Sequence, residues 1–295
     1  DCHTKPLSLL LRDGYHEYFG APHDGVGFVP GIMNHNHGST AICGVVLGSS
    51  TAFGELYEDS AFGGNVTTCR INRNTLVRNG SSLRAREEPD FLVSGDPWFR
   101  PVYLQAGPDG ALYVADFYNK IIGHYEVPLD HPGRDRHRGR IWKISYRGSD
   151  SRRDVSAVAE RSAPSGGLGK LSIEKLVGEL GSSSLARRAL ALDELERHPV
   201  AGAARALRER LPKAAGLPRA YIYHALNRLG ELEEEDIAAA ASHPDAVVRV
   251  HAQRLLAGTT LAGESPAGWM LSGFKDEEPM VRRAAVQAAA SRPGE

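Results

Sequence analysis

The chain has 295 residues, enough for about two domains of ordinary size. Apolar residues make up 41% and charged residues 24% of it, a composition that excludes wholesale disorder. The formal net charge is −1, and no apolar run approaches the roughly 20 residues that span a bilayer. These totals favour neither nucleic acid nor a membrane as partner.

The chain begins DCHTKPLSLLLRDGYHEYFG, without an initiator Met and without the pattern of a signal peptide, so we expect a piece of a longer protein. Its cysteines, Cys2, Cys43 and Cys69, form neither a CxxC pair nor a CxxCH haem-attachment motif. Cys43 and Cys69 fall in strand-like segments and can pair only if those strands are neighbours. Two free thiols are the favoured alternative.

Short β-rich runs separated by Gly-rich turns fill residues 1–148. The clearest is VYLQAGPDGALYVAD, in which Pro108-Asp109-Gly110 predicts a tight turn between two strands. This pattern is typical of a sandwich, a barrel or a propeller. We expect strands at Ala41–Leu47, Asn65–Ile71, Val102–Ala106, Ala111–Asp116 and Arg140–Tyr146.

Alternation within the fourth of these strands predicts which side chains face the core. Leu112 and Val114 should lie on one face, and Tyr113 and Ala115 on the other.

Residues 149–170 are rich in Ser, Gly and charge, as expected of a linker, and 171–295 carry helical repeats. The repeats align with Arg187, Arg219, Arg249 and Arg282 in equivalent places, with a period somewhat above 30 residues. Stacked helix pairs of this kind bury their apolar stripes against one another. The fold class predicted is therefore multidomain, β then α, with an α-solenoid of the HEAT type in the second half.

Two features of the repeats concern individual side chains. Asp245 and Glu278 fall near expected helix starts, where the helix dipole favours negative charge. Tyr221, Tyr223 and His224 are candidates for a binding groove, although packing between repeats is the more usual role of such a stripe.

Residues 87–144, from EEPDFLVSGDPWFRPVYLQAGPDG through HPGRDRHRGRIWKI, closely resemble the C-terminal part of the β-propeller in membrane-bound dehydrogenases of planctomycete and verrucomicrobial type. HNHGSTAICGVVL and NVTTCRINRNTL resemble the preceding blades. That family is related to the soluble quinoprotein glucose and sorbosone dehydrogenases, and HEAT-like repeats follow its propeller. Since a blade needs about 40 residues, the first half would supply about three blades of a partial propeller.

The resemblance implies a periplasmic or otherwise extracytoplasmic oxidoreductase that acts on a sugar or alcohol. It implies pyrroloquinoline quinone with Ca²⁺ as cofactors and a cytochrome c domain or protein as electron acceptor, and the repeat surface would serve protein partners. The alternative is a propeller and HEAT-repeat scaffold without chemistry of its own, which binds protein or carbohydrate.

His35 and His37 in NHNHGS alternate along an extended segment, so both rings should lie on one face. A neutral imidazole there could abstract the proton of an alcohol. Two imidazoles could also bind a metal, but a catalytic zinc site needs a third protein ligand, and we predict no metal site. The structural alternative is that both hydrogen-bond the loop ahead of the strand.

Trp98 and Arg100 in GDPWFRP are held between two prolines. The indole could stack on a planar quinone, and the guanidinium could take part in catalysis or pair with its carboxylates. The alternative is that Trp98 and Phe99 fill the core between blades and that Arg100 pairs with Asp96 or Asp116.

Asp116, Tyr118 and Asn119 follow the clearest strand, where loops often carry function. Their oxygens could contribute to cofactor binding, including Ca²⁺, although no calcium-loop spacing is present.

The crowded loop HYEVPLDHPGRDRHRGR contains His124 as a further catalytic candidate, and His131 and Arg134 as cofactor-binding candidates. Its arginines alternate with acids and lack interleaved aromatic residues, which argues against nucleic acid. A role in tying down a long loop through charge-assisted hydrogen bonds is favoured over catalysis.

Overall fold

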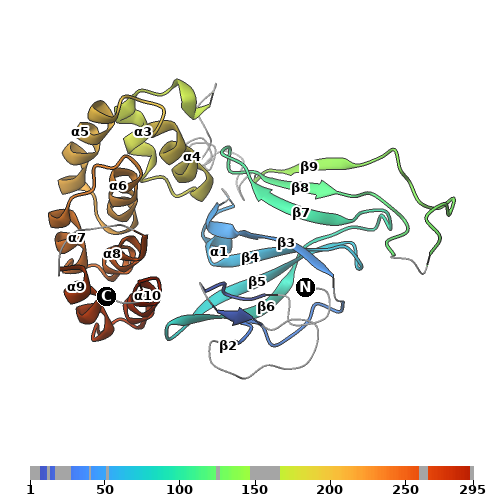
Figure 1. Ribbon diagram of the computed structural model, residues 1–295. Helices are drawn as coiled ribbons and strands as arrows, with labels where there is room; N and C mark the ends of the chain where they lie inside the picture. The colour runs from blue at the N-terminus through green and yellow to red at the C-terminus, as the bar shows by residue number, and fades with distance from the viewer. Residues whose placement is uncertain are drawn as a thin grey trace. The chain divides into compact units, whose positions relative to one another are not determined.

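The computed structural model describes residues 7–11, 14–16, 28–39, 41–50, 53–123, 127–146, 167–258 and 265–292. The chain divides into two compact units, Asp1–Ser162 and Ala163–Glu295 (Figure 1). The first contains sheets and the second contains helices, as predicted for β followed by α. The predicted linker, 149–170, spans the division, and most of it lies outside the described residues.

The larger sheet of the first unit has four antiparallel strands that follow one another in chain order. A two-residue connection joins the last two, with Asn79 paired to Ser82 and Gly80 at φ 58. Gly80 and Ser81 form this connection, and a loop that starts with glycine is a sequence signal for such a turn, because glycine adopts positive φ without strain. The strands are β3 Ile42–Leu47, β4 Ser60–Asn65, β5 Arg70–Asn79 and β6 Ser82–Val93.

The predicted strand at Asn65–Ile71 is wrong, because its centre is the turn between β4 and β5. Oδ1 of Asn65 accepts a hydrogen bond from the backbone N–H of Thr68, 3.1 Å away, and Cys69 has φ 58. An asparagine side chain that accepts a hydrogen bond from the backbone a few residues later closes a turn, and the strand ends there.

The smaller sheet contains three antiparallel strands, β7 Pro101–Ala106, β8 Leu112–Asp116 and β9 Arg140–Ile144, close to the predicted ranges. Gly110 has φ 75 in the predicted turn between β7 and β8. Leu112 and Val114 are fully buried while Tyr113 and Ala115 are half-buried, which confirms the predicted alternation.

The core of the first unit lies where the two sheets meet, with β3 and β4 against β7. Gly44, at φ 60, lets the backbones approach: a Cβ there would lie 2.9 Å from the backbone nitrogen of Leu104. Cys43 and Cys69 are free thiols in this unit. Its remaining elements are the paired β1 Tyr15–His16 and β2 Phe28–Val29, the 3-10 helix η1 Gly48–Ser50 and the short helix α1 Glu55–Glu58.

In the second unit, alternate helices pack side by side along the chain (Figure 1). Leu and Ala side chains form its two largest core clusters, as their helical spacing predicts. The α-helices are α3 Ile173–Glu179, α4 Leu185–Leu195, α5 Val200–Arg210, α6 Gly216–Arg228, α7 Glu234–Ala241, α8 Ala246–Gly258, α9 Ser265–Phe274 and α10 Pro279–Ala290. The 3-10 helices are η2 Leu168–Lys170 and η3 Leu211–Lys213.

The arginine that repeats from helix to helix is the fourth residue of α4, α6, α8 and α10. That position is Arg188 in α4, so the predicted alignment on Arg187 is one residue out of register. Arg188, Arg249 and Arg282 each donate to the carbonyl oxygens five and six residues earlier in the chain. Arg187 instead pairs with Glu179 at the end of α3.

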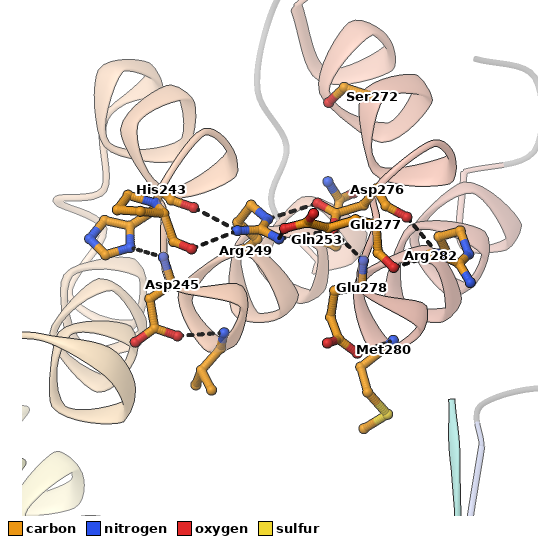
Figure 2. Close-up of polar contacts among 12 residues, drawn as sticks. His243, Asp245, Arg249, Gln253, Ser272, Asp276, Glu277, Glu278, Met280 and Arg282 are labelled. Carbon is orange, nitrogen blue, oxygen red and sulfur yellow. Dashed lines mark hydrogen bonds and ion pairs between the residues drawn. The ribbon is translucent and has the colours of Figure 1, made fainter. Parts of the chain in front are cut away.

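Figure 2 shows this arrangement at α8 and α10. Arg249 donates to the carbonyls of His243 and Pro244 and binds both carboxylate oxygens of Asp276, at 2.7 and 2.9 Å. Asp245 and Glu278 accept hydrogen bonds from the first turn of α8 and α10, where their negative charge was expected.

Candidate functional site

The two histidines of NHNHGS meet at one side chain of β5. Nε2 of His35 lies 2.7 Å from Oδ1 of Asn74, and Nε2 of His37 lies 3.1 Å from the same oxygen. The rings are edge to face with centroids 5.0 Å apart. Because an amide oxygen only accepts, both rings donate from Nε2, and the lone pair of each neutral ring is on Nδ1.

A row of buried asparagine side chains, linked by hydrogen bonds, holds the segment that contains the two histidines. Nδ2 of Asn65 donates to the backbone oxygen of His37 and to Oδ1 of Asn72, at 3.4 and 3.1 Å. Asn72 in turn donates to Asp90, 2.6 Å away. Asn72 and Asn74 are two apart on β5 and therefore project from the same face. The loop before β3 is thus held to the middle of the sheet by hydrogen bonds.

The environment of His37 keeps its imidazole neutral. Burial lowers the pKa of His37 below its ordinary value, and the hydrogen bond to Asn74 acts in the opposite direction. Nδ1 of His37 lies 3.6 Å from Oε1 of Glu87, which is about half exposed. A proton that arrives at Nδ1 would therefore meet a carboxylate.

A pocket of about 380 Å³ opens beside these side chains. Its polar lining includes His37, Asn72 and Asn74, and its apolar lining includes Met33 and Phe62. A concave surface with a few convergent polar groups on an apolar wall is the usual form of a small-molecule site.

Arg100, predicted to act in catalysis or on a cofactor, is buried and bound to the backbone. Its guanidinium donates to the carbonyls of Asn119, Val66 and Lys120, at 2.8, 2.6 and 3.1 Å. It also contacts the sulfur of Cys69 at 3.3 Å. The side chain therefore joins the β4–β5 turn to the segment after β8.

Asp116 and Asn119 belong to the same cluster. The two carboxylate oxygens of Asp116 accept from the backbone of Arg100 and Tyr118 and from the indole of Trp142. Asn119 donates to the carbonyl of Asp135 and accepts from the backbone of Ile121. These are structural bonds of the kind that buried polar groups require.

Trp98 and Tyr118 form an aromatic group with a cation. Their ring centroids are 5.5 Å apart, and the guanidinium of Arg140 lies 3.3 Å from the centroid of Tyr118. Tyr118 has φ 46, a strained conformation for a non-glycine residue.

Arg100 and Asp116 do not present free groups to a quinone or calcium in the arrangement observed. The donors of Arg100 face protein carbonyls, and the oxygens of Asp116 are taken up by three N–H groups. Within the described ranges, no three His, Cys, Asp or Glu side chains gather in a way that could hold a metal ion.

The crowded loop is tied down by its own arginines. Arg134 donates to the carbonyls of Gly123, Val127 and Pro128, and Nδ1 of His131 accepts from the backbone of Gly133. These contacts match the favoured tether role. His124, the remaining catalytic candidate, lies outside the described residues.

In the helical unit, Tyr223 is buried in a core cluster, and Tyr221 packs against another. Packing therefore accounts for both tyrosines. His224 is taken up separately below.

The predictions named the histidines but missed the residue that joins them. Asn72 and Asn74 in RINRNT alternate on a strand flanked by apolar residues. Two amides on the buried face of a strand are a signal of a polar network, because they must be hydrogen-bonded there.

Residues 23–148 match a protein-family model described as "Domain of unknown function (DUF7133)". The matched range includes both large sheets and ends before the first helix of the second unit. Searches of curated proteins and of solved structures find no match. Among the residues described, no helix is long and apolar enough to cross a membrane.

Proposed function

We propose that this chain is part of an extracytoplasmic oxidoreductase that binds a sugar or alcohol in the pocket beside His37. The observation that carries the proposal is the hydrogen bond between His37 and Asn74, whose side chains both line that pocket. The imidazole of His37 beside amides and apolar surface suits a polyol, which presents hydroxyl groups on one side and C–H groups on another.

The proposed architecture is a partial β-propeller followed by a HEAT-type α-solenoid. Consecutive antiparallel strands in two sheets support the first part. Side-by-side packing of alternate helices, with an arginine at the same position in four of them, supports the second.

In the proposed chemistry His37 is the proton acceptor. A substrate hydroxyl gives its proton to Nδ1 while Nε2 keeps its bond to Asn74. Glu87, 3.6 Å from Nδ1, stabilises the imidazolium. Asn74 also positions the ring, and its Nδ2 is a donor for a second hydroxyl.

Pyrroloquinoline quinone and Ca²⁺ remain part of the proposal, but we propose that residues other than those described here bind them. The side chains predicted to bind them here are engaged with the protein itself, so no step is assigned to them. A cytochrome c domain or protein as electron acceptor likewise remains proposed from the resemblance.

The test begins with binding. Saturation-transfer NMR of the 295-residue chain against a panel of sugars and alcohols should detect a ligand, and His37→Gln or Asn74→Ala should abolish the signal. His198→Gln, in the helical unit, is the control. No binding by the unaltered chain would overturn the proposed site.

Activity requires the longer protein. Dye reduction with added pyrroloquinoline quinone and Ca²⁺ should be lost in His37→Gln. A protein that binds sugar but reduces no dye would support the second candidate, a carbohydrate-binding scaffold, which the structural engagement of Arg100 and Asp116 favours.

A further inference from the structure

A second pocket, of about 280 Å³, is lined largely by the loop between β8 and β9. Trp98 forms one part of its wall, and Pro132 and residues 134–138 form the rest. Among the described residues, none lines both this pocket and the pocket beside His37. A ligand bound here would therefore be additional to the substrate proposed above. We call this cavity the loop pocket.

The wall of the loop pocket is held in place by hydrogen bonds to its own backbone. Nδ2 of Asn119 donates to the carbonyl oxygen of Asp135, 2.7 Å away. The carboxylate of Asp135 accepts from the backbone N–H of His137 at 2.8 Å. The guanidinium of Arg134 donates to three carbonyls of the same loop, as described above. Because the wall is ordered before a ligand arrives, binding costs less conformational entropy.

Basic side chains dominate the loop pocket. Arg134, Arg136 and Arg138 line it, and within the described part of the chain Asp135 is the one acidic residue that does so. Nε of Arg138 lies 3.3 Å from Oδ2 of Asp135, but the Arg138 side chain is 68% exposed. Arg136 is also exposed, and one of its N–H groups donates to the carbonyl of Leu129. The guanidinium groups of Arg136 and Arg138 are therefore accessible to a ligand in the pocket.

An aromatic surface lies beside these charges. The half-buried indole of Trp98 packs against Tyr118, and the guanidinium of Arg140 covers the ring of Tyr118 in turn. The backbone N–H of Trp98 donates to Oδ1 of Asp96 at 2.9 Å. Trp98 is thus fixed through both its side chain and its backbone, and it gives the basic pocket a flat apolar wall.

We propose that the loop pocket binds a sugar acid. Arg136 and Arg138 bind its carboxylate, because a guanidinium matches the planar geometry of that group. The C–H face of the sugar ring lies against the indole of Trp98, and the imidazole of His137 bonds a hydroxyl group. A carboxylate is favoured over the dianion of a phosphate ester, because Asp135 already offsets part of the charge of Arg138.

The test is an NMR titration of the full 295-residue chain with glucuronate and, in parallel, with glucose, which has a hydroxymethyl group in place of the carboxylate. We expect glucuronate to shift the indole N–H resonance of Trp98 and the ring resonances of His137, and glucose to leave both unchanged. The ring resonances of His37 report separately on the other pocket, so either site can fail without the other.

Variants of the two exposed arginines test which groups bind the carboxylate. Arg136→Gln and Arg138→Gln should each weaken glucuronate binding about tenfold, whereas Arg84→Gln, at an exposed arginine of β6, should leave it unchanged. Arg138→Lys keeps the charge without the planar fork, so its affinity should lie between those of Arg138→Gln and the unaltered chain. Thermal melts of the glutamine variants should match that of the unaltered chain, which excludes misfolding as the cause.

Three outcomes would overturn the proposal. The first is that glucuronate shifts neither Trp98 nor His137. The second is that glucose shifts them equally, which would show that the carboxylate is not recognised. The third is that acetate or inorganic phosphate alone produces the same shifts at matched concentration, which would identify a general anion site.

Discussion

Arg100 in the sheet unit and Arg249 in the helical unit are both largely buried, but only Arg249 is paired with a carboxylate. In the sheet unit, the guanidinium of Arg100 is surrounded by backbone carbonyls, and no carboxylate of the described chain reaches it. In the helical unit, Arg249 is bound by both oxygens of Asp276. The guanidinium of Arg100 is therefore stabilised by the partial charges of backbone carbonyls. That of Arg249 is stabilised by the full negative charge of a carboxylate from the next helix pair.

The two histidine pairs also differ in their hydrogen-bond partners. His35 and His37 share the oxygen of Asn74, whereas His224 and His251 bond each other directly beside Arg254. The bond to Asn74 acts to raise the pKa of His37 against the effect of burial, whereas the charge of Arg254 adds to burial in lowering the pKa of His224 and His251.

The largest effect is expected at Arg100. Arg100→Leu leaves the carbonyls of Val66, Asn119 and Lys120 without their donor inside the protein, so the free energy of unfolding should fall by about 4 kcal/mol. Urea denaturation measures it, with Arg84→Leu, an exposed arginine of β6, as control. A small loss would show that the loop carbonyls are satisfied without Arg100.

Asp276 should be next. Asp276→Ala removes the counter-charge of Arg249, whose side chain is 12% exposed, and should cost about 3 kcal/mol. Glu277→Ala is the matched control, because Glu277 is almost fully exposed and 3.8 Å from Arg249. Its loss should stay below about 0.5 kcal/mol. Equal effects would contradict a specific bidentate pair.

Acid should destabilise the helical unit through its histidine pair. Since the folded pKa values, about 4 and about 3, lie below the ordinary 6.5, the unfolded chain binds more protons. The contribution of the pair to the free energy of unfolding is complete above about pH 6.5 and should be lost progressively as the pH drops toward 4. Thermal melts of the His224→Gln, His251→Gln double variant should lack that slope, whereas His198→Gln should keep it.

The smallest effect concerns the imidazoles of the sheet unit. Asn74→Asp places a carboxylate where an amide oxygen contacts His37, and should raise the pKa of His37 by about 1 unit. NMR titration measures the shift, and Asn36→Asp, an exposed residue between the two histidines, supplies the same charge change without the contact. Equal shifts in the two variants would show that proximity in sequence, rather than the bond, sets the pKa.

Strand and helix type could be read from the sequence where periodicity is strong. The alternation of β8 and the apolar spacing of the helices report directly which side chains are buried, and both predictions hold. Asn65–Ile71 failed because β propensity says nothing about a side chain that closes a turn on its own backbone. The Gly-Ser signal at residues 80–81 was present and would have indicated the hairpin of β5 and β6.

The site was less accessible to sequence reasoning for a related reason. His35 and His37 could be named because their spacing is local, but Asn74 lies 37 residues beyond His37 and meets it only through the sheet. Arg100 was a candidate for cofactor binding because a guanidinium suits an anion. Its partners are backbone carbonyls, and residue identities alone do not predict which carbonyls will meet a side chain. The one-residue error at Arg187 arose because two adjacent arginines are indistinguishable without the helix start.

The contacts between successive helix pairs also decide where the protein can be shortened. Arg208 in α5 binds Asp236 in α7, and Arg249 in α8 binds Asp276 beyond α9. Ending the chain between α8 and α9 would leave Arg249 without its carboxylate partner. Ending it between α6 and α7 would do the same to Arg208. Each guanidinium links one helix pair to the next through an ion pair. Truncating the protein at either point, for crystallisation or for fusion, should therefore expose an arginine charge that is paired in the intact chain.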